Sequence, residues 1–279
     1  MITKMSPAKI NLYLRVLRMR EDGYHDILSL MQRISLCDEM TFSPGAKRTV
    51  IRCPDSSLPE DENNIVYRAA TAFYSRTAAQ PDVEITIRKR IPIAAGLGGG
   101  SSNAATTLIT LNELSGNPLT REELQRIGST LGADVPFFIF GRTAWVSGIG
   151  DEMIETAPLP NLWFVLINPG FEVSTKLVYQ GLNLGLTNGR INYSIPRFYT
   201  GEDVIRSLTN DLEKVTLKLH PVLGQIKSLL LESGAEGALM SGSGPTIFGV
   251  FTDEESALQA ERRLQNRGNR WSVFGARSL

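Results

Sequence analysis

The glycine-rich stretch of residues 92–105 constrains the fold of this chain more than any other segment. Four glycines and two serines follow one another closely in it, at Gly96, Gly98, Gly99, Gly100, Ser101 and Ser102. Glycine reaches backbone conformations that other residues avoid, and it lets a ligand approach the backbone. We expect the N–H groups of this stretch to converge on an anion such as phosphate.

The flanking residues place the glycines between a strand and a helix. Residues 83–87 alternate apolar and polar side chains, which is typical of a half-buried strand. After the glycines, apolar residues recur at helical spacing, at Ala104, Leu108, Leu111 and Leu114. The start of a helix has unpaired N–H groups and the positive end of the helix dipole, which favour phosphate. A tight turn alone would need only one or two of these glycines.

Common phosphate loops do not fit the stretch. A P-loop ends in Gly-Lys followed by Ser or Thr, and no lysine follows a glycine in this chain. The dinucleotide-binding fingerprint needs glycine or alanine where this chain has Ser101. The protein-kinase sequences His-Arg-Asp and Asp-Phe-Gly are absent. The loop therefore belongs to another class.

Composition indicates a globular protein without an overall charge. Of the 279 residues 42% are hydrophobic, and 29 basic side chains balance 29 acidic ones. We therefore expect no nucleic-acid partner and, without an apolar run of about 20 residues, no membrane partner. Cys37 and Cys53 form no metal-binding pattern and are expected to be reduced, with a disulfide as the alternative. No signal peptide is recognisable, which predicts a cytoplasmic protein.

Residues 92–105 resemble the second motif of the GHMP kinases, a family of small-molecule kinases. Further motifs of the family resemble residues 7–14, 22–25, 131–137 and 240–244. The resemblance implies a two-domain α+β fold, with a ribosomal-S5-like N-terminal domain in residues 1–157 and a ferredoxin-like C-terminal domain in residues 158–279. Two prolines at positions 158 and 160 support a boundary there.

Local patterns predict the elements of both halves. In the first half we expect strands at residues 9–17, 39–42 and 83–87, a helix at 64–76 capped by Asn63 or Asn64, and a helix begun by a capping box of Thr120 and Glu123 and ended by Gly132 as its C′ residue. In the second half we expect strands at 162–167, 237–240, 246–251 and 271–274, with helices at 174–184, at 222–233 and after a capping box of Thr252 and Glu255. This second order is ferredoxin-like.

The resemblance assigns the glycine loop to ATP. The loop residues expected to contact it are Pro92, Ala94, Gly96, Leu97, Gly98, Gly99, Gly100, Ser101 and Ser102. Ser102 either helps to hold Mg²⁺ or caps the helix, and Asn63 resembles a contact to adenosine. Lys89 and Arg90 are expected to form a solvated basic pair or to add positive charge near the nucleotide. The loop at residues 241–246 either is a plain hairpin or supports the phosphate end.

Lys9 and Asp134 are the expected catalytic residues. Lys9 shares a strand face with Asn11, although strand lysines are usually solvated. Asp134 follows a helix end and precedes an apolar run, where sequence alone favours an N-cap with Pro136 in the first turn. The resemblance reverses this preference. It implies that Asp134 accepts the proton of the acceptor hydroxyl, that Lys9 orients this hydroxyl and lowers its pKa, and that Asn11 contacts the substrate.

Aromatic residues point to a flat heterocycle as part of the substrate. Tyr24 and His25 are adjacent and suit stacking with edge hydrogen bonds. The resemblance implies that they bind cytosine, with Thr175 and Tyr179 contributing from a later segment. His220 has no chemical companion in sequence and is expected to be structural.

The motifs are most similar to the branch of the family that uses ATP to phosphorylate the 2-hydroxyl of 4-diphosphocytidyl-2-C-methyl-D-erythritol, in the non-mevalonate route to isoprenoid precursors. Two alternatives stay open. Another GHMP kinase would act on mevalonate, homoserine or a sugar, and a nucleotide-binding regulator would keep the fold without turnover. The sequence does not distinguish a monomer from a homodimer.

Overall fold

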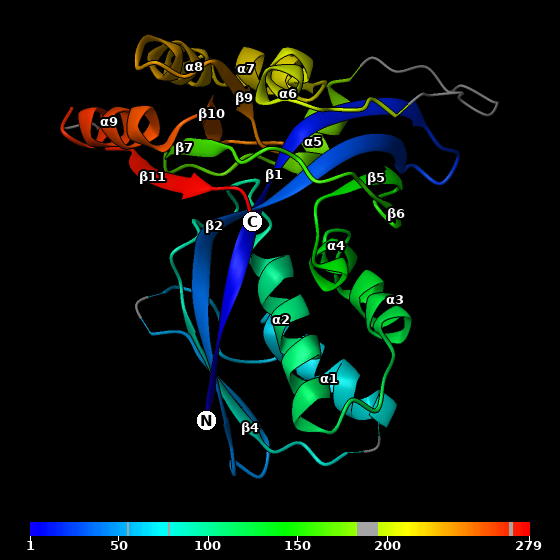
Figure 1. Ribbon diagram of the computed structural model, residues 1–279. Helices are drawn as coiled ribbons and strands as arrows, with labels where there is room; N and C mark the ends of the chain where they lie inside the picture. The colour runs from blue at the N-terminus through cyan, green and yellow to red at the C-terminus, as the bar shows by residue number, and fades with distance from the viewer. Residues whose placement is uncertain (55, 78, 183–194, 268–269) are drawn as a thin grey trace. The chain divides into compact units, whose positions relative to one another are not determined.

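The computed structural model describes residues 1–54, 56–77, 79–182, 195–267 and 270–279. These residues form two compact units, each made of stretches that are not adjacent in sequence (Figure 1). Unit 1 comprises residues 1–8, 37–93 and 98–142, and unit 2 comprises residues 9–36, 94–97 and 143–279. The long strands β1 (Ile2–Met19) and β2 (His25–Pro44) each contribute one end to each unit. The sequence boundary at residue 157 stays a prediction.

Unit 1 combines a small sheet with four helices among its described residues. Strand β3 (Thr49–Arg52) is parallel to β4 (Val83–Arg88), which is antiparallel to the C-terminal end of β2. The helices are α1 (Ile65–Thr77), α2 (Gly99–Leu114), α3 (Arg121–Leu131) and α4 (Val135–Phe140). Helices α1 and α2 pack side by side (Figure 1). Large side chains such as Phe42, Phe73 and Phe137 are fully buried and form the core.

Helix starts in unit 1 follow the predicted chemistry more closely than helix ends. The capping box of α3 is confirmed, because Thr120 Oγ1 accepts from Glu123 N at 3.3 Å and the Glu123 carboxylate accepts from Thr120 N at 2.9 Å. Of the two candidate caps of α1, Asn64 fills the role, accepting from Val66 N at 2.9 Å. Gly132 ends α3 in an extended conformation with φ 177°. Gly132 is thus the C-cap and lacks the left-handed conformation that is typical of a C′ glycine, so the prediction of a C′ glycine is wrong.

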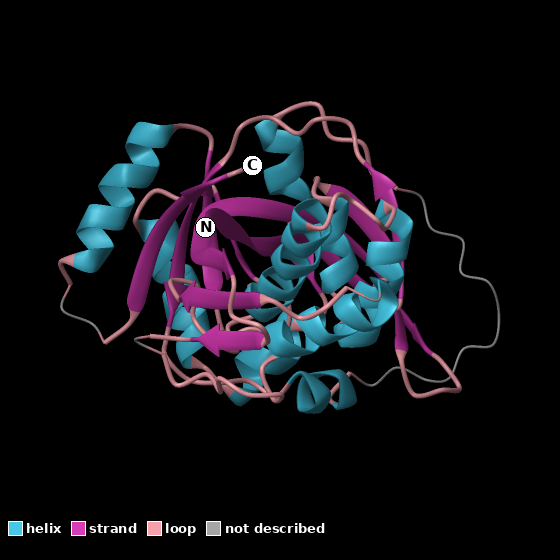
Figure 2. Ribbon diagram, turned by 90° about the horizontal axis from the view of Figure 1, so that it is seen from below, coloured by secondary structure: helices cyan, strands magenta, loops and turns pink. Residues whose placement is uncertain are grey.

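Unit 2 contains a four-stranded antiparallel sheet. Its strands are β7 (Trp163–Asn168), β9 (Gly237–Met240), β10 (Ile247–Phe251) and β11 (Ser272–Arg277), in the spatial order β11-β7-β10-β9. Helices α8 (Val222–Glu232) and α9 (Glu254–Gln265) bury apolar side chains against this sheet. The strands and intervening helices confirm the predicted ferredoxin-like order. Figure 2 distinguishes the helices from the strands by colour.

Shorter elements complete unit 2. They are β5 (Ala144–Gly148), which pairs with β2 and with β6 (Glu152–Glu155), β8 (Thr209–Asn210), which is parallel to β1, and the helices α5 (Thr175–Gln180), α6 (Gly201–Ser207) and α7 (Glu213–Leu219). The helix predicted over residues 174–184 ends at Gln180, and its positions 183–184 lie outside the described residues.

The predicted capping box of Thr252 and Glu255 at the start of α9 is wrong. Asp253 caps the helix instead, accepting from Ser256 N at 2.8 Å. The hydroxyl of Thr252 is already bonded to Glu236 at 2.5 Å, so the cap falls one residue later. Asp is as good an N-cap as Ser or Thr, so the helix is still capped by a side chain.

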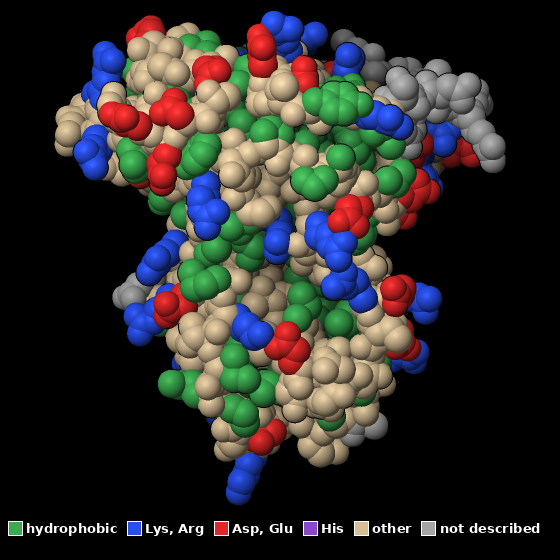
Figure 3. Space-filling model, viewed as in Figure 1, with side chains coloured by type: hydrophobic (Ala, Val, Ile, Leu, Met, Phe, Trp, Pro, Cys, Tyr) green, Lys and Arg blue, Asp and Glu red, His purple; other side chains and the backbone are tan. Residues whose placement is uncertain are grey.

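Charges and thiols agree with the composition. Basic and acidic side chains are interspersed on the face shown in Figure 3. Cys37 and Cys53 are not joined by a disulfide, and burial raises the pKa of the Cys53 thiol. None of the helices in the described ranges is long and apolar enough to span a membrane.

Candidate active site

The glycine loop connects β4 to a helix start that is left open. Gly98 is the N-cap of α2 in a left-handed conformation with φ 69°, and within the described chain no side chain caps this helix. Among the described residues, the N–H groups of Gly99, Gly100 and Ser101 have no hydrogen-bond acceptor, whereas Ser102 N donates to Gly98 O at 2.9 Å. The first turn holds no acidic side chain. The start of this 16-residue helix is therefore available to an anion.

Ser102 lies inside the first turn of α2, so the alternative that it caps the helix is wrong. The helix begins at Gly99, five residues before Ala104, the first of the apolar residues at helical spacing, because two of the glycines are part of it. Ser102 is fully buried, and its Oγ accepts from Ser6 Oγ at 2.8 Å. Ser101 is the half-exposed hydroxyl of the loop. A role for Ser102 in holding Mg²⁺ stays a prediction.

Gly96 is required by close packing within unit 2. Its φ is 77°, and a Cβ at this position would lie 2.3 Å from the carbonyl oxygen of Ser241. Ser241 Oγ donates to Gly96 O at 2.9 Å, and a Cβ on Gly242 would lie 3.3 Å from the same oxygen. Residues 241–246 join β9 to β10 as a hairpin and also pack on the glycine loop. The hairpin interpretation is therefore confirmed, and support of the phosphate end stays a prediction.

Lys9 and Asn11 form a buried polar cluster in unit 2. Lys9 Nζ donates to Asn11 Oδ1 at 2.7 Å, and Asn11 Nδ2 donates to Ser29 Oγ at 2.8 Å. Lys9 is only 4% exposed, so the alternative of a solvated strand lysine is wrong. Its backbone N–H donates to Leu97 O at 2.9 Å. The predicted catalytic lysine therefore lies beside one part of the glycine loop.

Asp134 occupies the N-cap position of α4 in unit 1 without capping it. Its side chain makes no capping hydrogen bond, although Pro136 lies in the first turn as expected. The capping interpretation is therefore wrong. Asp134 is half-buried. A Cβ on nearby Gly132 would lie 3.6 Å from Ser101 Oγ, so the turn that carries Asp134 borders the first turn of α2.

The predicted substrate residues His25 and Tyr179 meet in unit 2. Their ring centroids are 4.9 Å apart with an interplanar angle of 40°. Burial lowers the pKa of His25, which keeps the imidazole neutral at pH 7, with one nitrogen as donor and one as acceptor. Tyr24 is 63% exposed in the turn that precedes His25. Tyr24 therefore offers an exposed aromatic ring, and the adjacent residue His25 offers a ring that can form hydrogen bonds.

Other predicted positions fall into place more simply. Thr175 Oγ1 lies 2.7 Å from Ser243 Oγ, which ties α5 to the hairpin loop of residues 241–246. His220 packs on the ring of Phe171 at 4.8 Å, consistent with its predicted structural role. Asn63 is exposed and bonded to Asp61, and its contact to adenosine stays a prediction.

Sequence reasoning missed a buried ion pair under the glycine loop. Lys89 Nζ bonds to the carboxylate of Asp38, and the two side chains are 9% and 0% exposed. The expectation of a solvated basic pair is thus wrong for Lys89. The missed signal was strand alternation, because Asp38 shares its face of β2 with Met40 and Phe42, which are fully buried.

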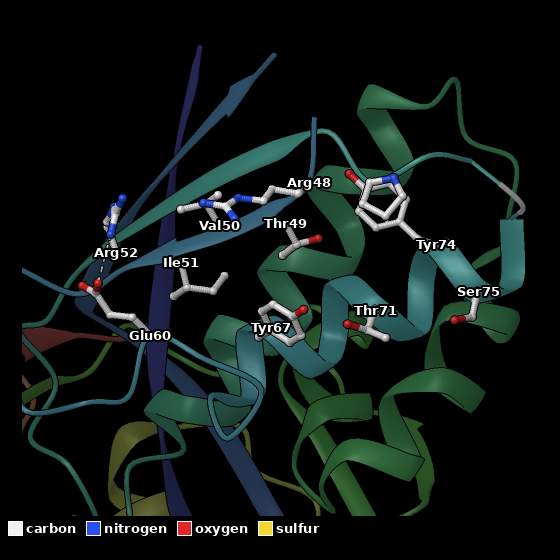
Figure 4. Close-up of a pocket in the computed structure, with 11 residues that line it drawn as sticks. Arg48, Thr49, Val50, Ile51, Arg52, Glu60, Tyr67, Thr71, Tyr74 and Ser75 are labelled. Atoms are coloured by element: carbon white, nitrogen blue, oxygen red, sulfur yellow. Dashed lines mark hydrogen bonds and ion pairs between the residues drawn. The ribbon is translucent and has the colours of Figure 1, made fainter. Parts of the chain in front are cut away.

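Unit 1 also contains a pocket of about 560 Å³, which is lined by residues other than the site residues described above. Figure 4 shows β3 and α1 on its two sides, with Arg52 paired to Glu60 and the rings of Tyr67 and Tyr74 along the helix. None of the predicted catalytic, ATP or substrate residues lines it. It is therefore not the candidate active site.

Comparisons with known proteins agree with the family that the sequence motifs resemble. Residues 64–142 match the model of the GHMP kinases N terminal domain, and residues 200–270 match the model of GHMP kinases C terminal. The 4-diphosphocytidyl-2-C-methyl-D-erythritol kinase of Syntrophus aciditrophicus is 56% identical over 279 residues, covering 100% of both chains. That of Geobacter metallireducens is 48% identical over 281 residues, covering 100% of this chain and 99% of the relative.

Solved structures agree with this similarity. A crystal structure of 4-(cytidine 5'-diphospho)-2C-methyl-D-erythritol kinase superposes with a TM-score of 0.82 at 32% identity, covering 100% of both chains. A homoserine kinase from Cytophaga hutchinsonii has a TM-score of 0.73 at 20% identity, covering 100% of this chain and 94% of that one, and shows the shared fold.

Proposed function

This chain belongs to the GHMP kinase family, and we propose that it transfers a phosphoryl group from ATP to the 2-hydroxyl of 4-diphosphocytidyl-2-C-methyl-D-erythritol. The observation that carries kinase activity is the uncapped start of α2, with three N–H groups open to phosphate. The acceptor is inferred from the name shared by the relatives that match the whole chain. The product is a 2-phosphate in the non-mevalonate route to isoprenoid precursors.

The ATP phosphates bind at the loop of residues 92–102, and Mg²⁺ accompanies them. Among the described residues, no group of three or more His, Cys, Asp or Glu side chains could hold a metal ion. This fits Mg²⁺, which kinases bind mainly through substrate phosphates, waters and one or two protein oxygens. The ion neutralises charge on the phosphates. We propose Ser101 Oγ as a protein oxygen for it, because this hydroxyl is half-exposed whereas Ser102 is fully buried and bonded to Ser6.

Asp134 accepts the proton of the acceptor hydroxyl as its oxygen attacks the γ-phosphorus, and ADP leaves. Lys9, held by Asn11, orients this hydroxyl and lowers its pKa. The acceptor is tertiary and needs close alignment with the donor. His25 and Tyr179, with the exposed ring of Tyr24, hold the cytosine.

A substrate panel with coupled ADP detection tests this function. We expect ADP release with the cytidyl substrate and little with the same polyol phosphate lacking cytidine. Tyr24→Ala should raise the KM for the cytidyl substrate and leave kcat nearly unchanged, since it removes binding alone. Turnover of mevalonate, homoserine or a sugar would assign another kinase of the family. No ADP release with any acceptor would favour the nucleotide-binding regulator.

We also propose a cytoplasmic enzyme that acts as a monomer or homodimer. The described helices offer no membrane span, and the substrate is a small molecule. Size-exclusion chromatography with light scattering distinguishes the two oligomeric states.

A further inference from the structure

Asp38 is a fully buried carboxylate whose oxygens are all engaged. Its Oδ1 accepts from the backbone N–H groups of Arg90 at 2.8 Å and Ile91 at 2.9 Å. Its Oδ2 accepts from Lys89 Nζ and from Asn103 Nδ2, the latter at 3.0 Å. A buried charge is costly unless it is paired and hydrogen-bonded. The Asp38 carboxylate has such a set of partners, and its hydrogen bonds hold each of them in a defined position.

The partners of Asp38 bracket the glycine loop. Arg90 and Ile91 are the residues through which the chain leaves β4 and enters the loop. Asn103 lies in the second turn of α2, where the chain has left the loop. One side chain therefore fixes both ends of a glycine-rich segment that would otherwise have great conformational freedom. All these residues belong to unit 1.

The network continues to the first turn of α2. Asn103 Nδ2 also donates to Ser6 Oγ at 2.9 Å, and Ser6 Oγ donates to Ser102 Oγ at 2.8 Å. A Cβ on Gly99 would lie only 3.3 Å from Lys89 Nζ. The buried groups thus contact the inner side of the turn whose N–H groups are open. A shift of Asp38 would tilt this turn.

We propose that Asp38 is a positioning residue, which holds the open N–H groups of α2 in the orientation that binds the ATP phosphates. It acts through Lys89 and Asn103 and does not touch the nucleotide. The inference rests on the proposed function, because it assigns the start of α2 to ATP. Orientation of this kind is sensitive, since displacements of about 1 Å at a phosphate site change rates and affinities strongly.

Asp38→Asn tests the proposal while keeping the shape of the side chain. The amide nitrogen cannot accept from Lys89 or Asn103, so the α2 end of the loop is released. We expect the Kd for ATP, measured by calorimetry without acceptor, and the KM for ATP to rise about tenfold, as for other residues that orient a ligand-binding group. The KM for the cytidyl substrate should stay within twofold of its wild-type value. Asn103→Ala removes the same anchor while the Asp38–Lys89 ion pair stays in place, and keeps the test possible if Asp38→Asn does not fold.

Leu111→Ala is the matched control, because Leu111 is buried on the same helix but lies beyond the network. It should lower the Tm at least as much as Asn103→Ala and leave the Kd for ATP unchanged. The proposal is overturned if both network variants bind ATP within twofold of wild type, or if Leu111→Ala weakens ATP equally. Wild-type protein that binds ATP but does not phosphorylate the cytidyl substrate would refute the proposed function alone, because the calorimetric comparison needs no acceptor.

Discussion

Helices α2 and α3 are neighbours in unit 1 and begin in opposite ways. The start of α3 is closed by its own side chains, because Thr120 and Glu123 form a capping box. Hydrogen bonds from the backbone N–H of Glu122 and from the Thr120 hydroxyl hold the pKa of the Glu122 carboxyl below its usual value. The start of α2 has glycines in these places and no acidic residue. A helix that satisfies its own N–H groups has a structural start, whereas α2 leaves them for a ligand.

The contrast extends to other helices. Ser174, Thr200 and Asp253 cap α5, α6 and α9 through their side chains. Like α2, helices α7 and α8 have no side-chain cap, because their N-cap residues are Leu212 and Pro221. Helix α4 differs from all of these, because Asp134 has the right side chain in the right place and does not cap.

The largest effect is expected for Asp134→Asn. We expect kcat to fall about 10³-fold, since general base catalysis contributes about 10²–10⁴-fold. Asparagine keeps the shape of the side chain, so we expect the variant to fold, and its Tm checks this. The coupled ADP assay measures kcat, and calorimetry should find the Kd for ATP unchanged. Near-normal turnover would remove the assignment of Asp134 as the base.

An acidic residue in the first turn of α2, like those in the first turn of α3, should strongly weaken the binding of ATP at the start of α2. Gly100 is exposed, and a Cβ there meets only Ile65 Cγ2 at an ordinary 3.8 Å, so Gly100→Asp and Gly100→Ala both fit. The aspartate places a negative charge where phosphate binds, and we expect the KM for ATP to rise about 100-fold, equivalent to about 3 kcal/mol.

Gly100→Ala is the control for size in this experiment. It should stabilise the helix by up to about 1 kcal/mol and raise the KM for ATP far less than the aspartate does. Equal KM values for the two variants would show that the phosphates bind away from the first turn of α2.

Helix α5 carries both a capping residue, Ser174, and a residue that we propose to bind the substrate, Tyr179. Tyr179→Ala should raise the KM for the cytidyl substrate about tenfold, since stacking on a base contributes about 1–3 kcal/mol. Ser174→Ala should cost about 1 kcal/mol of stability, through the lost cap, with no change in KM. Steady-state kinetics and thermal unfolding of both variants measure the two effects. The reverse pattern would make Tyr179 a core residue.

The smallest effect is expected for Thr120→Ala at the start of α3. It removes one side of the capping box and should lower the free energy of unfolding by about 1 kcal/mol. The kinetic constants for both substrates should be unchanged, as measured in the coupled assay. A change in the KM for ATP would contradict the distinction between the two helix starts.

Much of this architecture was predictable because its determinants are local. The capping box at Thr120, the strand at residues 237–240 and the glycine loop between strand and helix are encoded by residues a few positions apart. Errors arose where one of several local candidates had to be chosen. Thr252 lost the cap of α9 to Asp253 because its hydroxyl is bonded to Glu236, 16 positions away.

The candidate site shows the same division. Lys9, Asn11 and the loop glycines were found by pattern and resemblance, but burial of Lys9 at 4% exposure contradicts what a strand lysine suggests. Ser102 was placed in the right segment, but its hydrogen bond to Ser6 was not predicted, because Ser6 lies 96 positions away. Asp38 was not noticed, since a lone aspartate in a strand carries no motif.

By itself, the sequence determined the type of several elements, among them the capped helix α3 and the strand β9, which loop is rich in glycine, and which family the motifs resemble. These properties depend on backbone hydrogen bonding and side-chain periodicity within a few residues. Only the tertiary structure decided that Gly96 must lack a side chain to meet Ser241 and that Asp38 lies against Lys89, pairs separated by 145 and 51 positions. Such contacts depend on strand register and on the packing of buried side chains, which no local pattern specifies.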